Sequence, residues 1–199
     1  LTMQSSRLRN RLLAQTEPFR AATAYCGVRP THMTGFKCAT CGEYHDELPM
    51  CLGAPAPALW YQIPEEERES RTLLGSDSCV IDNQHYFVLG RIVLPVIDCP
   101  DPFVWLAWVS LSPENFKRAG EVWETEGREN EPPYFGWLQS ALPYAQSTLS
   151  LATNVVTRPV GERPLIEMHE CNHQLYVQTK QGITIVEVQE IVERAFHGT

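Results

Sequence analysis

The chain has 199 residues, of which 43% are hydrophobic and 20% are charged, and its formal net charge is −8. This composition is typical of a globular domain that can bury a core. The acidic balance disfavours nucleic-acid binding, which depends on Lys and Arg. No apolar run reaches the roughly 18 residues of a membrane helix, so we expect no membrane association.

Residues 1–32 differ from the rest of the chain. They carry five arginines and a single acidic residue, Glu17, and they end just before Met33. We interpret residues 1–32 as a non-native or flexible N-terminal extension and residues 33–199 as a single α+β domain. The alternative is a native helical arm, because Leu8, Leu12 and Leu13 have helical spacing.

The first half of this domain predicts one helix and three strands. Residues 64–74 begin with Pro64 and place acidic side chains in the first turn, which favours a short helix. Strands follow at 79–81 and 85–96, with a turn at Asp82-Asn83 between them. Residues 103–111 are apolar on both faces, which is typical of a central strand covered on both sides.

The second half predicts two helices and two strands. Ser112 is an N-cap for a helix that begins at Pro113 and runs through Trp123, and a polar loop follows at 126–133. Strands are expected at 148–158 and 164–169. Thr184 and Glu187 form a capping box for a helix over 184–196. We therefore predict an α+β fold with a mainly antiparallel sheet, flanking helices and an N-terminal zinc knuckle at 36–45.

The knuckle rests on the strongest local motif, Cys38-x-x-Cys41-Gly42 followed by His45. Two cysteines at this spacing present two thiolates from one turn to one ion, and zinc accepts imidazole equally well. His45 is close enough in sequence to be a third ligand. A closed tetrahedral site needs a fourth, for which Cys79, Cys51, His85 and water are the candidates.

Two other interpretations of the motif compete with zinc. The cysteines could be two reduced, partly buried thiols, because the chain has seven cysteines and no visible secretory signal. A redox Cys-x-x-Cys is disfavoured, because no βαβ unit precedes it. In a reducing compartment, closely spaced cysteines suggest a metal more than a disulfide.

Several separate pieces of the chain resemble the bacterial DUF2199 family over roughly residues 36–197. They are Phe36-x-Cys38-x-x-Cys41-Gly42-x-x-His45, Asp77-Ser78-Cys79-Val80-Ile81, Trp108-Val109-Ser110-Leu111-Ser112 with Asn115-Phe116, Tyr134-Phe135-Gly136-Trp137-Leu138, Arg163-Pro164 and Gly182-Ile183. The resemblance implies a small bacterial cytoplasmic protein. It also implies that the Asp-x-Cys piece belongs with the Cys-x-x-Cys piece, which makes Cys79 the expected fourth zinc ligand. The family often has Pro where this chain has Gln174, which weakens any role carried onto His173.

Two further groups of residues invite a functional interpretation. Tyr134, Phe135 and Trp137 surround Gly136 and could line a ligand pocket, although aromatic side chains more often fill a core. The side chains of His169, Cys171 and His173 would share one face of a strand and could bind a second metal, although an ordinary polar turn is the simpler interpretation.

No nucleotide-binding, hydrolase or metalloprotease motif is present, so the sequence favours a non-enzymatic role. The first hypothesis is a binding or interaction module with a structural Zn²⁺ bound by Cys38, Cys41, His45 and Cys79. The alternative is a zinc-dependent hydrolase with an open coordination position and Asp77 or Glu43 near the metal-bound water. A regulator or immunity-type partner protein is a third possibility. The sequence identifies neither the protein or small-molecule partner nor the oligomeric state.

Overall fold

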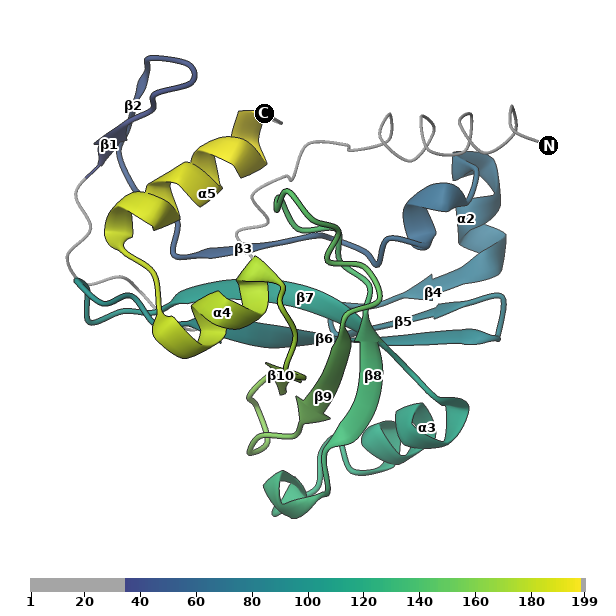
Figure 1. Cartoon of the computed structure of the whole chain (residues 1–199). Coiled ribbons are helices and arrows are strands. Elements are labelled where there is room, and N and C mark those ends of the chain that lie inside the picture. Colours follow the sequence, from purple (N-terminus) through teal and green to yellow (C-terminus); the bar gives the residue numbers. More distant parts are fainter. Residues whose placement is uncertain (1–34, 198–199) are drawn as a thin grey trace.

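The longest strands of the protein close into a small five-stranded barrel (Figure 1). The computed structural model describes residues 35–197, so the expectation for residues 1–32 lies outside the described residues. The barrel strands are β6 (His85–Leu94), β7 (Phe103–Leu111), β8 (Tyr134–Leu138), β9 (Ala152–Val156) and β10 (Leu165–Met168). Each strand pairs antiparallel with the next, and a short parallel contact between β10 and β6 closes the ring.

Three short strands extend the sheet beyond the barrel. β3 (Cys51–Gly53) lies parallel to β7 on one side. β5 (Ser78–Ile81) pairs antiparallel with β6 on the other side, and β4 (Thr72–Leu74) pairs antiparallel with β5 at the sheet edge. The α+β prediction is therefore confirmed, and the predicted mainly antiparallel sheet is for the most part a barrel, which the sequence did not predict.

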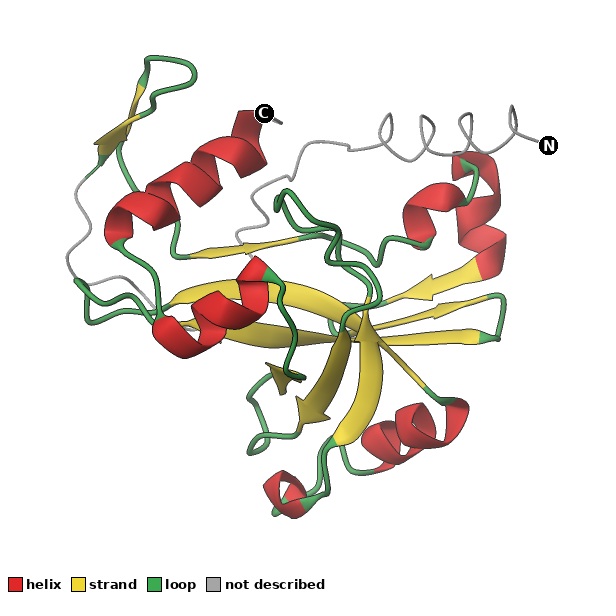
Figure 2. Cartoon of the chain, viewed as in Figure 1, coloured by secondary structure: helices red, strands yellow, loops and turns green. Residues whose placement is uncertain are grey.

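Four α-helices within residues 35–197 surround the strands (Figure 2). They are α2 (Glu65–Arg71), α3 (Pro113–Glu121), α4 (Gln174–Gln181) and α5 (Ile185–His197), and single 3₁₀ turns lie at η1 (Trp60–Gln62) and η2 (Arg128–Asn130). Helices α4 and α5 lie together over one side of the strands, and α3 lies at the far end of the barrel (Figure 1). None of the helices in residues 35–197 has the length and apolar character that a membrane crossing requires.

Strands β6 and β7 separate two apolar clusters. Val88, Ile92 and Leu94 of β6 belong to the larger cluster, which also contains the buried faces of α4 and α5. Phe87 and Leu89 alternate with them and belong to the smaller cluster on the other face. Every residue of β7 except Ser110 is buried, as expected of a strand covered on both faces.

Helix α5 has a well-defined N-terminus, which fixes where its last turn lies. The Glu187 carboxylate accepts a hydrogen bond from the Thr184 N–H at 2.7 Å, and the Thr184 hydroxyl accepts one from the Glu187 N–H at 3.2 Å. Val188, Ile191 and Ala195 are buried along one side of the helix. The capping box and the apolar stripe agree with the sequence prediction.

Other local predictions need correction. Residues 134–138 form strand β8, which was not among the strands expected from the sequence. The strand expected over 164–169 is observed as β10, whereas His173, considered with His169 and Cys171 as one face of a possible strand, caps helix α4. The predicted helix over 64–74 ends at Arg71, and its last three residues form strand β4.

Candidate metal centre

The Cys-x-x-Cys motif lies on the turn of a small hairpin. Strands β1 (Phe36–Lys37) and β2 (Tyr44–His45) pair antiparallel, and Phe36 lies opposite His45. Within the turn the Cys38 N–H donates to the Glu43 carbonyl at 2.9 Å, and the Gly42 N–H donates to the Cys38 carbonyl at 3.0 Å. Gly42 has a φ of +75°, which glycine adopts without steric cost. We call residues 36–45 the knuckle.

The knuckle packs on the last two turns of α5. The carboxylate of Glu193 accepts a hydrogen bond from the Ala39 N–H at 2.8 Å, and the Gln189 side-chain amide donates to the Lys37 carbonyl at 3.2 Å. The His45 ring stacks on Phe36 with 5.0 Å between centroids, and it lies 6.3 Å from the Phe196 ring. These contacts join a segment near residue 40 to one near residue 195.

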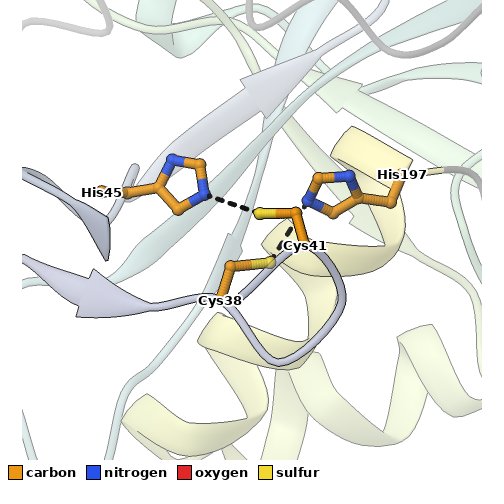
Figure 3. Close-up of side chains that lie close together, drawn as sticks. All are labelled: Cys38, Cys41, His45 and His197. Carbon is orange, nitrogen blue, oxygen red and sulfur yellow. Dashed lines mark hydrogen bonds between the residues drawn. The ribbon is translucent and has the colours of Figure 1, made fainter. Parts of the chain in front are cut away.

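Four side chains of the types that bind metals in proteins meet at this junction (Figure 3). The donor atoms of Cys38, Cys41, His45 and His197 all lie within 4.8 Å of one another. Cys41 Sγ lies 3.6 Å from His45 Nε2, and Cys38 Sγ lies 3.2 Å from His197 Nε2. In tetrahedral zinc sites, Zn–S and Zn–N bonds of ordinary length separate sulfur and nitrogen ligands by about 3.6 Å. The two sulfur–nitrogen distances therefore suit one tetrahedral ion.

The site is buried on one side and open on the other. Cys38 is buried, Cys41 is exposed, and both histidines are half-buried. Burial raises the pKa of the Cys38 thiol. Hydrogen bonds, chiefly those from the Cys41 and Thr40 backbone N–H groups, together lower this pKa by more than burial raises it, so the net shift is downward. A lowered pKa favours the thiolate, which is the form that binds metal.

Glu193 is the acidic group next to the site. Hydrogen bonds from the Gln189 side chain and the Ala39 N–H hold the pKa of the Glu193 carboxyl below its usual value. Coulombic interactions with the His197 and His45 side chains lower the pKa of this carboxyl further, whereas burial raises it. A carboxylate with both hydrogen bonds made is therefore ionised beside the four donors.

The structure brings three of the four predicted ligands together and leaves Cys79 elsewhere. Cys79 is fully buried in β5, opposite Phe87, within the smaller apolar cluster. Burial raises the pKa of its thiol to about 11. The resemblance implied that Cys79 lies beside the knuckle, but the knuckle instead lies on α5. The other candidates are also elsewhere: Cys51 is in β3 beside the smaller cluster, and His85 begins β6 as an exposed residue.

His197 is the fourth member of the group, and no sequence pattern predicted it. Its only local signal is that it lies four residues after Glu193 and thus on the same helix face. Its partner Cys38 is 159 residues away in sequence, so no motif spacing connects them.

His169, Cys171 and His173, considered as a possible second metal site, do not form a metal-binding group within residues 35–197. His169 Nε2 lies 3.1 Å from Asn154 Oδ1, and the His169 ring meets Phe135 edge-on at 5.5 Å. His173 Nδ1 accepts a hydrogen bond from the Leu175 N–H at 3.0 Å, which is an N-cap role. Cys171 is half-buried against the larger cluster.

The aromatic side chains of strand β8 lie on both faces of the strand. Tyr134 is buried, whereas Phe135 is 43% exposed and Trp137 is 46% exposed. The pattern follows the alternation of β8. The segment therefore gives one ring to the core and two to the surface.

Comparison with known proteins places the chain in a family. The family model described as "Uncharacterized protein conserved in bacteria (DUF2199)" matches residues 37–183, which include Cys38, Cys41, His45 and Cys79 but not His197. No curated protein and no solved structure gives a match. Because the family model covers most of the chain, this protein belongs to the bacterial DUF2199 family.

Proposed function

We propose that this protein is a zinc-binding module in which one Zn²⁺ is held by Cys38, Cys41, His45 and His197. The observation that carries the proposal is the meeting of four donor atoms, from two segments far apart in the chain, within 4.8 Å of one another. The ion would fasten the knuckle to the end of α5. Its role would be structural, because metal binding that joins two elements adds to the free energy of folding.

The number of donors favours a structural site over the hydrolase alternative. Catalytic zinc sites have three protein ligands and keep the fourth position for water or substrate. Here four side chains supply a full tetrahedral set. A hydrolase would also need a free carboxylate near that water, whereas the nearby Glu193 carboxylate already accepts hydrogen bonds from Ala39 and Gln189.

A binding or interaction role completes the proposal. Phe135 and Trp137 are exposed neighbours on β8, with 5.1 Å between their ring centroids. Exposed aromatic side chains are more frequent at protein interfaces than on the rest of a surface. A metal-stabilised scaffold with an exposed aromatic pair supports a non-enzymatic function.

The main rival is a metal-free pair of thiol–imidazole hydrogen bonds. Such bonds would explain Cys38 with His197 and Cys41 with His45 separately. They give no reason for the two pairs to converge on one point, whereas a shared ion does. The two interpretations also differ in metal content, which is directly measurable.

Elemental analysis of protein purified without chelator tests the proposal. We expect about one zinc per chain, and X-ray absorption should give two sulfur and two nitrogen ligands. The His197→Ala variant should lose one nitrogen ligand and retain zinc poorly. The matched control is His169→Ala, which removes an imidazole outside the group and should keep the zinc. Reduced protein without zinc, iron or another transition metal would refute the proposal.

A further inference from the structure

We propose that Glu193 is a positioning residue that docks the knuckle on α5 and presets Cys38 and Cys41 against His197 before any metal binds. This inference rests on the proposed zinc site, but it concerns the protein's own contacts. It assigns a role to a buried carboxylate that is not itself one of the four donors.

The contacts of Glu193 are specific and enclosed. The residue is 8% exposed. Its Oε1 atom accepts the Ala39 N–H at 2.8 Å and the Gln189 side-chain amide at 2.9 Å. The same Gln189 amide reaches the Lys37 carbonyl at 3.2 Å. Glu193 and Gln189 thus hold the backbone on both sides of Cys38.

Amide groups, rather than an ion pair, hold the Glu193 carboxylate in place. None of the ion pairs found within residues 35–197 involves Glu193. Burying a carboxylate is costly unless its hydrogen bonds are made, and here amide groups make them. The cost of burying this carboxylate is therefore better explained by its role in orienting the knuckle backbone than by a role in ion pairing.

The spacing along α5 connects this carboxylate to the site. Glu193 lies one helical turn before His197, so both side chains project from the same face. Ala39 directly follows Cys38 and lies inside the turn that carries both cysteines. The turn of α5 that contains Glu193 therefore binds the knuckle backbone, and the next turn contains His197, one of the four donor residues.

Groups that orient metal ligands affect affinity without touching the ion. Loss of such a group typically weakens metal binding by about 10- to 100-fold. The Glu193→Ala variant removes the acceptor for the Ala39 N–H, so we expect its zinc affinity to fall by about this factor. Glu193→Gln keeps an oxygen that can accept the same hydrogen bond, and should bind zinc much more like the natural chain.

The experiment measures zinc affinity by competition with a chromophoric chelator for the natural chain, Glu193→Ala and Glu193→Gln. The matched control is Glu190→Ala, which removes another carboxylate of α5 that is 59% exposed and pairs only loosely with Arg194. Cobalt absorption spectra of each variant report ligand geometry, which a general loss of stability would not change. Hydrogen exchange of the Ala39 amide in metal-free protein reports docking directly, and we expect faster exchange only in Glu193→Ala.

The other possible outcomes refute either the positioning role of Glu193 or the proposed zinc site. Equal zinc affinity in Glu193→Ala and the natural chain would refute the positioning role. Equal losses in Glu193→Ala and Glu193→Gln would show that charge acts rather than placement, which also refutes it. If the natural chain binds no zinc, the proposed function fails, and the Ala39 exchange rate alone then decides whether Glu193 docks the knuckle.

Discussion

Two buried cysteines lie in contrasting regions of this protein, Cys38 in the knuckle and Cys79 in strand β5. Cys38 is buried, yet backbone N–H groups lower the pKa of its thiol, and a histidine lies 3.2 Å away. Cys79 is equally buried, but its neighbours are apolar and its pKa rises to about 11. Burial alone therefore does not decide what a cysteine does. Its chemistry depends on the hydrogen-bond donors and the neighbouring side chains that the fold places beside it.

The largest difference between the two regions is expected in how a cysteine substitution changes zinc affinity. Cys38→Ser should weaken zinc binding by more than about 100-fold, because loss of a ligand costs more than loss of a group that only orients one. Cys79→Ser should leave zinc affinity unchanged. Chelator competition measures both. Loss of zinc in Cys79→Ser with normal binding in His197→Ala would reverse our assignment of the fourth ligand and restore the sequence-based one.

Metal removal should lower the stability of the whole folded protein. With free zinc about 1,000 times above its Kd, binding to the folded state alone adds about 4 kcal/mol. For a protein of this size that corresponds to a Tm about 8–16 °C higher. Thermal unfolding with and without excess chelator measures the difference, with the Cys38→Ser variant as control. A Tm that is the same in both conditions would indicate that the knuckle does not couple to the barrel.

Alkaline pH should affect the β5 region. The pKa of Cys79 is about 11 in the folded protein and 9.0 in the unfolded reference, so between these values the unfolded chain loses a proton that the folded protein retains. Stability therefore falls as pH rises from about 9 to 11, by about 2–3 kcal/mol in total. Urea unfolding at several pH values should reveal this slope in the natural chain and a shallower slope in Cys79→Ala. Identical slopes would place the thiol in a more polar environment than the structure gives.

A smaller effect is expected from replacing the Cys79 sulfur. Cys79→Ser buries a hydroxyl in an apolar cluster, which costs about 1–3 kcal/mol when no partner is available. Cys99→Ser should cost less, because Cys99 is only half-buried. Urea unfolding midpoints measure both at neutral pH. A Cys79→Ser variant as stable as the natural chain would mean that water or a backbone group reaches the position.

Sequence patterns predicted the local elements better than their assembly. Strand β7 was predicted with its observed bounds, and the capping box of α5 identified that helix correctly, because both signals are local. The closure of the barrel was missed, since it depends on a single paired position between Leu165 and Arg91. The knuckle residues Cys38, Cys41 and His45 were grouped by spacing. His197 could not be, because the barrel between them determines its position.

The long separation between Cys38 and His197 also affects how the protein is made. Synthesis proceeds from the N-terminus, so the knuckle emerges with three of its four donors long before α5 exists. Joining residues 159 apart instead of 4 apart costs about 3 kcal/mol more in loop-closure entropy if the intervening chain is unfolded. A folded barrel removes this cost by holding both segments in place. The four-residue group can therefore assemble only after α5 has been synthesised, and a folded barrel favours its formation.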